Sequence, residues 1–318
     1  TFTHFTETVT EMLEYYDLQP EIIVADLHPD YESTQFAEDY AGSNKIKLVK
    51  VQHHYAHFLS CMFESGLGAP AVGIIMDGTG FGGDGTIWGG EVFTGDLHSF
   101  ERKGHIGHFP LPGGERAIRE PWRILAGFLD EGEFMDECSW AGASAAGVYS
   151  IKDKRNFSPL TSSAGRLFDA AGALLGFRQN VSYEAEAAIY LEMLALCNPT
   201  EDFITPVYKD DNGIITCDPD AIIRGLLLLS GKREESYIAK LFHNSIIEAM
   251  AGIAESVCSA AGIDNVLLAG GVYQNRLILA GMEKRLARAG LNVFFNRKIP
   301  ANDAGISAGQ AVYGVYNA

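Results

Sequence analysis

Residues 71–91 read AVGIIMDGTGFGGDGTIWGGE. The stretch begins with a run of apolar side chains that ends at Asp77, which is typical of a strand buried in a sheet. Five glycines follow within residues 78–85, and a second extended segment then runs from Ile87 to Phe93. A third extended segment lies near residues 98–102. The stretch therefore predicts a β-meander whose first turn is unusually rich in glycine.

Helical and strand patterns alternate on both sides of this meander, which favours parallel strands joined by crossover helices. The order after the meander is helix, strand, helix, strand, helix, and the same order precedes it. We therefore predict an α/β protein built as a duplicated actin-like ATPase domain, with the first copy lacking its N-terminal strands. We expect residues 1–68 to form the remainder of the first subdomain and residues 69–318 the second, with a helical insertion over about 118–262. A first sheet of about two strands would expose an edge, so we expect further sequence upstream.

The composition excludes some partners. The 318 residues carry 41 acidic and 24 basic side chains, which gives a net charge of −17 and a pI near 4.9. A surface this negative repels phosphate backbones and anionic lipids, so we expect no unaided binding to nucleic acid or membranes. No apolar run approaches the roughly 18 residues of a membrane-spanning helix. The five cysteines include no C-x-x-C pair, which favours a reduced, cytoplasmic protein.

Three histidines fall within the segment VQHHYAH at residues 51–57. On a helix, His53 and His57 lie one turn apart on the same face, so both imidazoles can bind one cation. Two half-buried, hydrogen-bonded histidines are the alternative. His54 points about 100° away from them; it could act as a proton relay or be a solvated side chain. An oxygen ligand must come from elsewhere. In the segment NDAGISAGQ, Asn302 or Asp303 stands where a helix N-cap should be, and Asp303 could instead supply the ligand.

Two glycine-rich turns could hold a nucleotide. Asp77 ends a buried strand and can contact a metal ion or its water. The amides that follow can approach a phosphate, although a tight hairpin also needs glycine; they belong to Gly78, Thr79 and Gly80. In LAGGVYQN, a strand enters a helix through Gly270 and Gly271, where a base or ribose can lie, and a structural crossing is the alternative. The LAGGVYQN turn is not the G-x-G-x-x-G fingerprint and it stands late in the chain, which disfavours a Rossmann fold.

Several other side chains could contribute to a site. Asp169 and Glu184 could bind ribose hydroxyls, and a solvated helix face is the alternative. The loop PLPGGERAIREPWR could clamp an anion or form surface ion pairs, and it contains Arg116, Arg119 and Arg123. Cys61 has apolar neighbours and reads as a core thiol. The sequence therefore shows no convincing internal nucleophile.

Taken together, these segments resemble the C-terminal domain of the HypF carbamoyltransferases of nickel–iron hydrogenase maturation. That domain is similar to TsaD-type threonylcarbamoyl-transfer proteins, which have the actin-like ATPase (ASKHA) fold. The resemblance covers nearly the whole chain, from ADLHPDY near residues 25–31 through SSAGRLFDAAGALLG to NDAGISAGQ. The segments DGTGFGGDGTIWGGE and PLPGGERAIREPWR are more specific than the histidine segment, which the wider superfamily shares.

The resemblance implies a metal and a nucleotide in the cleft between the subdomains. His53, His57 and Asp303 would bind a divalent iron or zinc ion, with Asp77 beside it. Mg²⁺ would accompany ATP. The adenosine pocket would be lined by Gly270, Gly271 and Asn275, and the ribose would be held by Asp169 and Glu184. The catalytic residues that we expect are Asp77, His54 and Arg119.

The family makes carbamoyl-adenylate from carbamoyl phosphate and ATP, and passes the carbamoyl group to the C-terminal cysteine of HypE. The thiocarboxamide becomes a cyanide ligand of the hydrogenase iron. Upstream acylphosphatase-like, zinc-finger and YrdC-like domains of the full-length family protein form the adenylate, so this chain would catalyse only the transfer. The mixed anhydride is already activated, and the chain must position it and stabilise charge. Rival interpretations are threonylcarbamoyl transfer to tRNA, O-carbamoylation of a small molecule, and a nucleotide-binding module without catalysis.

Overall fold

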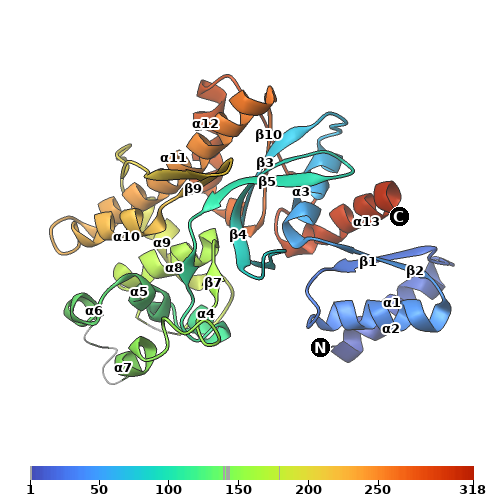
Figure 1. Ribbon diagram of the computed structural model, residues 1–318, viewed down its shortest axis with the longest axis horizontal. Coiled ribbons are helices and arrows are strands. Elements are labelled where there is room, and N and C mark those ends of the chain that lie inside the picture. The colour runs from blue at the N-terminus through green and yellow to red at the C-terminus, as the bar shows by residue number, and fades with distance from the viewer. Residues whose placement is uncertain (1, 139, 141–143, 179) are drawn as a thin grey trace.

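The computed structural model describes residues 2–138, 140, 144–178 and 180–318. The predicted meander lies at the centre of a large twisted sheet with helices on both faces (Figure 1). Its three strands pair antiparallel and are β3 (Ala71–Phe81), β4 (Ile87–Gly95) and β5 (Phe100–Ile106). The sheet continues from β3 through two parallel strands, β10 (Asn265–Ala269) and β11 (Asn292–Phe295). The mixed α/β order predicted for the second half of the chain is therefore confirmed.

Strand β3 is buried on both faces, and its side chains alternate between two hydrophobic cores. Val72, Ile74 and Met76 face a large core that α8 (Ala164–Leu174), α11 (Glu235–Ala261) and α12 (Arg276–Arg288) complete. Ala71 and Ile75 face a smaller core beneath α3 (His53–Glu64). Because β3 separates these cores, it holds Asp77 between the two layers. The strand continues through Gly78, Thr79 and Gly80 to Phe81, so the prediction that it ends at Asp77 is wrong.

A smaller lobe contains the N-terminal part of the chain (Figure 1). Its two strands pair in parallel, and the lobe consists of α1 (Phe2–Tyr15), β1 (Ile22–Asp26), α2 (Glu32–Asn44) and β2 (Lys47–Val51). Within the described part of the chain, no further strand joins this pair. The C-terminal helix α13 (Ile306–Asn317) packs against β1 and α3, so the last helix of the chain connects the small lobe to the large sheet.

The region expected to be a helical insertion also contains strands. Its helices are α4 (Glu115–Arg119), α5 (Trp122–Phe128), α6 (Glu131–Cys138), α7 (Ser144–Tyr149), α9 (Glu186–Ala195) and α10 (Pro219–Leu227), besides α8 and α11. The short β7 (Leu160–Thr161) pairs with β4 and with β6 (Phe109–Pro110). The polar stretch near 200–220 contains the hairpin of β8 (Tyr208–Asp211) and β9 (Ile214–Cys217), which extends the sheet beside β5. Asn212 and Gly213 make its two-residue turn with φ of 55° and 85°, a hairpin signal that the expectation of a helical insertion overlooked.

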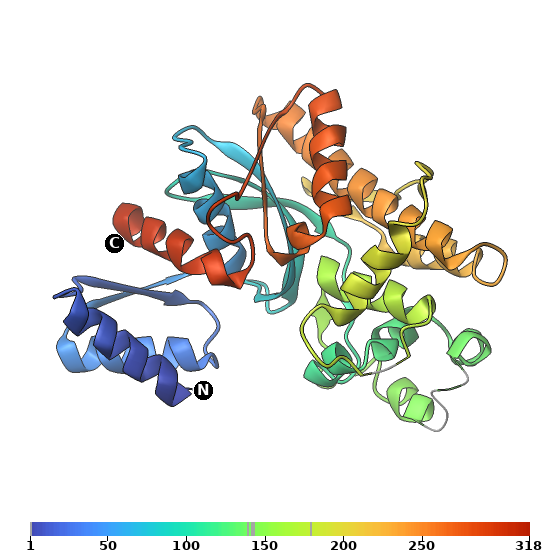
Figure 2. The same ribbon diagram turned by 180° about the vertical axis from the view of Figure 1, so that it is seen from behind.

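Helices α13 and α3 cross at very close range (Figure 2). A Cβ atom on Gly309 would overlap the carbonyl of Ala56 in α3, so the crossing requires glycine at this position. The 3₁₀ turn η3 (Asp303–Gly305) leads directly into α13. The helix crossing therefore positions Asp303 near the first turn of α3.

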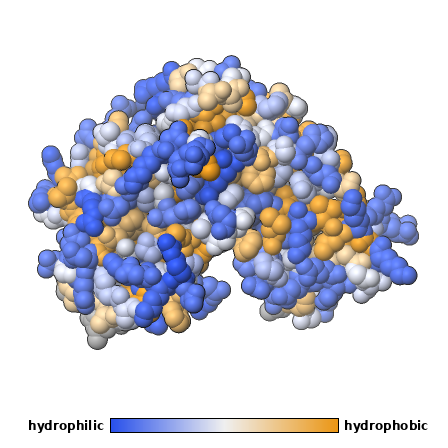
Figure 3. Space-filling view, viewed as in Figure 1, coloured by the Kyte–Doolittle hydropathy of each residue, from blue (hydrophilic) through white to orange (hydrophobic). Residues whose placement is uncertain are grey.

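The surface is divided by a notch between the lobe of α1 and α2 and the lobe of α4 to α8 (Figure 3). Polar and apolar residues alternate over both lobes in this view. Among the described residues, no helix combines the length and the apolar character needed to cross a bilayer.

We predict that Gly309→Ala destabilises the protein by at least about 2 kcal/mol, because the added methyl group forces α13 away from the α3 backbone. Chemical denaturation with a spectroscopic readout measures the change in the free energy of unfolding. Gly42→Ala in α2 is the matched control, because no atom lies within 4 Å of the added Cβ; we expect it to be neutral or to stabilise by about 0.5–1 kcal/mol. Equal stability of the two variants would contradict the close crossing.

Candidate metal centre and nucleotide pocket

Two imidazoles and two carboxylates converge where α3, β3 and η3 meet. One ligand atom from each of His53, His57, Asp77 and Asp303 lies within 4.8 Å of all the others. The Nε2 atoms of His53 and His57 lie 3.3 and 3.2 Å from Asp77 Oδ2. The same two nitrogens lie 3.4 and 3.3 Å from Asp303 Oδ1. The i, i+4 histidine pair and the distant aspartate therefore meet, and Asp77 completes the group.

Each backbone segment delivers its side chain for a local reason. The Gln52 side chain caps α3 by accepting a hydrogen bond from the N–H of Tyr55 at 2.9 Å, so the helix begins at the first histidine. Asp77 continues the alternation by which Ala71 and Ile75 of β3 face α3, and the pairing of β3 with β4 is regular up to Met76. Asn302, rather than its neighbour, caps η3. The carboxylate of Asp303 is therefore free to join the cluster, and the interpretation of that aspartate as a simple helix cap is wrong.

The donor set suits a divalent zinc or iron ion, because both metals accept imidazole nitrogen and carboxylate oxygen. The His57 Nε2 atom is buried and has no hydrogen-bond partner in the described part of the chain, although two carboxylates face it. A cation between these groups would satisfy all four. We identify this cluster as a candidate metal centre.

Asp26, at the end of β1, supports the cluster from behind. Its Oδ2 lies 2.9 Å from His53 Nδ1, which leaves His53 Nε2 directed at the cluster. A carboxylate on the outer nitrogen of a metal-binding histidine orients the ring and raises its basicity. Sequence reasoning missed this role. An acidic residue at the carboxyl end of a parallel strand, in a chain with a histidine pair, was the available signal.

The electrostatics of the cluster favour charge separation in the absence of a metal. Burial opposes a charged His53, yet hydrogen bonds that its ring donates to Asp26, Asp303 and Asp77 raise the pKa of the imidazole well above the usual range. Burial likewise opposes a charged His57, and Asp303 and Asp77 raise its pKa. The two imidazoles in turn hold the pKa of Asp77 well below its ordinary value, against the effect of burial. Protons and a metal ion therefore compete for the same nitrogens.

His54 is fully buried, so the alternative of a solvated side chain is wrong. The Oε1 atom of Gln52 is committed to the α3 cap, so its Nε2 group donates to His54 Nδ1 at 3.0 Å and to the carbonyl of Phe81 at 3.2 Å. The His54 proton is therefore on Nε2, which has no partner among the described residues. The ring lies directly under Gly80, where a Cβ atom would overlap it. His54 does not line the nucleotide pocket, and its role in proton transfer stays a prediction.

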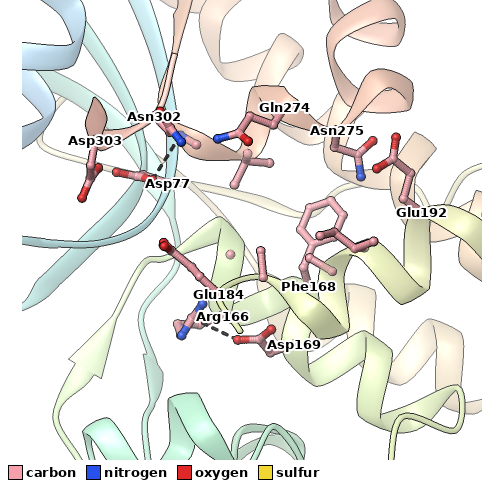
Figure 4. A pocket seen from close by; sticks show the side chains of 17 residues that line it. Asp77, Arg166, Phe168, Asp169, Glu184, Glu192, Gln274, Asn275, Asn302 and Asp303 are labelled. Atoms are coloured by element: carbon pink, nitrogen blue, oxygen red, sulfur yellow. Dashed lines mark hydrogen bonds and ion pairs between the residues drawn. The ribbon is translucent and has the colours of Figure 1, made fainter. Parts of the chain in front are cut away.

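A cavity of about 320 Å³ opens beside the cluster. Figure 4 shows Asp77 and Asp303 at one end of this pocket, and Phe168 and Asn275 toward the other. The residues predicted to bind a nucleotide that do line it are Gly78, Asp169, Glu184, Gly271 and Asn275. Three others do not line it, namely Thr79, Gly80 and Gly270.

Residue 270 must be glycine because of the backbone conformation and the close packing at this turn. Gly270 has a φ of 103°, and a Cβ atom there would overlap the backbone of Met76. The residue therefore lets β10 turn tightly against β3. The turn presents the Gly271 amide, which donates to Asp77 Oδ1 at 3.1 Å. Asn275 caps α12 through its side-chain oxygen and contacts His243 through Nδ2 at 2.9 Å, at the far end of the pocket.

A buried ion pair forms one wall of the pocket. Arg166 Nε lies 3.1 Å from Asp169 Oδ2, both side chains are nearly inaccessible, and neither atom completes a hydrogen bond in the described part of the chain. Burial raises the pKa of Asp169 to about 6, although the charge of Arg166 opposes the shift. Asp169 is therefore not on a solvated helix face. Its unsatisfied carboxylate fits a ligand that brings hydroxyl donors, whereas Arg166 is a cation that sequence reasoning had not selected.

The three arginines of the segment PLPGGERAIREPWR do not form one clamp around an anion. Arg116 Nε pairs with Glu120 Oε1 at 2.9 Å, and Arg123 pairs with the other oxygen of the same carboxylate. Two of the three arginines are thus committed to ion pairs, Arg116 at the surface and Arg123 in a buried position. Arg119 ends α4 and does not line the nucleotide pocket, so its contact with a carbamoyl group stays a prediction.

We predict that the chain binds about one equivalent of zinc and that the affinity rises with pH. Below the raised pKa values of His53 and His57, protons occupy the nitrogens that the metal needs. The affinity should therefore keep rising above pH 6.5, by up to roughly tenfold per pH unit for each proton displaced. Competition titration with a zinc-binding dye measures it. His57→Ala should abolish binding, whereas the exposed control His98→Ala should not; a pH-independent affinity would contradict the assignment.

We predict that Asp169→Asn weakens AMP binding about 10- to 100-fold, because it removes the carboxylate that is predicted to accept the ribose hydroxyls. Binding of 2′,3′-dideoxy-AMP, which lacks those hydroxyls, should change little. Isothermal titration calorimetry measures both. Glu192→Gln, another carboxylate change in the same pocket, is the matched control. An equal loss for AMP and for the dideoxy nucleotide would mean that Asp169 does not hold the ribose.

Two family models match nearly all of the chain. The model described as "Carbamoyltransferase, Kae1-like Domain, second subdomain" matches residues 73–310, and the "HypF Kae1-like domain" matches residues 1–64. Among curated proteins, a carbamoyltransferase HypF homolog of Cupriavidus necator is 35% identical over 319 residues, which are 96% of this chain and 80% of the relative. Carbamoyltransferase HypF of Rhizobium leguminosarum bv. viciae is 36% identical over 310 residues, which are 96% of this chain and 40% of the relative.

Solved structures of similar sequence share the fold. The crystal structure of full-length HypF in the phosphate- and nucleotide-bound form has a TM-score of 0.92 at 34% identity, over 98% of this chain and 41% of that chain. HypF of T. kodakarensis has a TM-score of 0.88 at 31% identity, over 97% of this chain and 42% of that chain. The chain thus spans about two fifths of most of these proteins, with shares of 40–42%. These matches confirm the duplicated Kae1-like fold, and the chain belongs to the HypF family of carbamoyltransferases.

Proposed function

We propose that the chain transfers a carbamoyl group from carbamoyl-adenylate to the C-terminal cysteine of HypE, as a step of nickel–iron hydrogenase maturation. One observation carries the proposal: Asp77 and Asp303 belong to the candidate metal centre and also line the pocket that suits a nucleotide. An adenylate in that pocket would hold its phosphoryl and carbamoyl groups beside the cation. The name carbamoyltransferase HypF, shared by several relatives, supports carbamoyl as the transferred group.

The pocket walls suit the parts of an adenylate. Asp169 and Glu184 offer carboxylates to the ribose hydroxyls. The guanidinium of Arg166 lies beside Gly78, close enough that a Cβ on that glycine would be 3.8 Å from it, and it supplies a positive charge for the phosphate. Phe168 offers an apolar face to the base at the end far from the metal centre. The phosphate- and nucleotide-bound state of a similar structure supports this assignment.

The acceptor must bring its own nucleophile. Cys61 is completely buried in the smaller core, and burial raises the pKa of its thiol to about 12. The pocket lining contains no cysteine, serine or lysine among the described residues. His53, His57 and Asp303 would hold a divalent iron or zinc ion, which would supply a Lewis acid for the phosphate and carbamoyl oxygens. Asp77, Arg166 and the ribose carboxylates then hold the anhydride in place for attack by an external thiolate.

The proposal also covers where the carbamoyl-adenylate is made and in which compartment the protein works. Formation of carbamoyl-adenylate from carbamoyl phosphate, ATP and Mg²⁺ would take place on upstream acylphosphatase-like and YrdC-like domains, and the greater length of the relatives supports such domains. All five cysteines are unpaired, which supports a reducing compartment such as the cytoplasm.

We expect the zinc- or iron-loaded chain to carbamoylate HypE when it is supplied with carbamoyl-adenylate. Mass spectrometry of HypE should show the mass of one added carbamoyl group on the terminal cysteine. A His53→Ala, His57→Ala double variant should lose the activity, because it loses the cation, while the exposed control His98→Ala should keep it. Transfer to tRNA instead of HypE, or full activity of the double variant, would contradict the proposal.

A further inference from the structure

The loop between β1 and α2, residues 26–31, forms a wall of the metal centre that the nucleotide pocket does not use. Asp26 contacts His53 through one carboxylate oxygen, and its other oxygen accepts the backbone N–H of His28 at 2.8 Å. The His28 ring stacks on Tyr31 with centroids 4.2 Å apart and planes 5° from parallel. Neither stacked ring lines the nucleotide pocket. The loop is therefore anchored to the metal centre and presents two aromatic rings beside it.

Phe81, at the end of β3, completes this wall from the large sheet. Its ring lies 5.3 Å from His28 in an edge-on arrangement. We call His28, Tyr31 and Phe81 the acceptor rim. All three side chains are partly exposed, and the Asp303 side chain is 68% exposed. His53, His57 and Asp77 are buried, so α3 and β3 close the centre from below. Once a nucleotide fills the pocket, the rim is the side from which a second substrate can reach the centre.

The rim offers two hydrogen-bond donors. His28 Nδ1 accepts the backbone N–H of Asp30 at 3.2 Å, so a neutral ring carries its proton on Nε2. The Tyr31 hydroxyl has no hydrogen-bond partner among the described residues. Burial raises the pKa of Tyr31, and nearby carboxylates of the metal centre add to this, so the hydroxyl stays protonated. Donors beside aromatic faces suit the carbonyl groups of a peptide, whereas a polyanion would meet the carboxylates of Asp26, Asp30, Glu32 and Asp303.

Resting on the function proposed above, we propose that the acceptor rim binds the C-terminal backbone of the protein that receives the carbamoyl group. His28 Nε2–H and Tyr31 O–H donate to backbone carbonyls of the acceptor, and the rings pack against its last side chains. The terminal thiol, having lost its proton to water, then lies at the metal centre. Its sulfur forms a bond to the carbamoyl carbon, the bond from that carbon to the phosphate oxygen breaks, and AMP leaves with the electron pair.

The test measures binding of a fluorescent peptide that ends in the acceptor's cysteine to the full chain loaded with zinc and AMP. Tyr31→Phe removes only the hydroxyl, and His28→Asn keeps an acceptor for Asp30 but removes the Nε2 donor. Each should weaken binding about five- to tenfold, the usual worth of one hydrogen bond. Tyr40→Phe, in the helix α2 that begins directly after Tyr31 but outside the rim, is the matched control and should bind as the wild type does.

Transfer kinetics provide the second readout. In both rim variants the KM for the peptide should rise with the dissociation constant, while kcat and zinc content stay at wild-type values. Unchanged peptide binding in both variants, loss of zinc from them, or displacement of the peptide by tRNA would overturn the inference. If the wild type binds the peptide through the rim but transfers no carbamoyl group, the rim stands and the proposed function fails.

Discussion

The contact between α13 and α3 is the constraint on which the rest of the site depends. Gly309 lets the two helices approach so closely that no side chain fits between Gly309 and the Ala56 carbonyl. Because η3 leads directly into α13, this approach places Asp303 beside His53 and His57, about 250 residues away along the chain. The candidate metal centre is therefore assembled by helix packing, and the same packing holds the small lobe against the large sheet.

The candidate metal centre and the pocket share two carboxylates, those of Asp77 and Asp303. Asp77 faces both histidines through Oδ2 and receives the Gly271 amide on Oδ1, so one carboxylate connects α3, β3 and the turn after β10. Three of the four ionisable groups of this cluster are buried, which is costly unless a cation or shared protons balance them. Among the described residues that line the pocket, Arg166 is the only arginine or lysine, and it is buried.

The sequence predicted the meander, the alternating elements and the histidine pair, because each follows from local periodicity. The sequence left two interpretations of Asp303 open, a helix cap or a metal ligand. In the structure Asn302 caps the turn, and Asp303 joins the histidines. The sequence could not predict which residue pairs with a buried charge such as Asp26, because Asp26 contacts His53 only through tertiary packing. The backbone amides of Thr79 and Gly80 were predicted to approach a phosphate, yet residue 80 must be glycine to leave room for the His54 ring. A glycine in such a segment can let a ligand approach the backbone or can make room for a neighbouring side chain. Its position in the sequence does not distinguish these two roles.

Anomalous diffraction from crystals grown with zinc and AMP tests the central claim most directly. We expect one zinc peak within coordination distance, about 2.0–2.2 Å, of His53 Nε2, His57 Nε2 and a carboxylate oxygen of Asp303. The phosphate of AMP should lie between that peak and Arg166. A zinc peak elsewhere, or nucleotide density outside the pocket beside Asp77, would contradict the account.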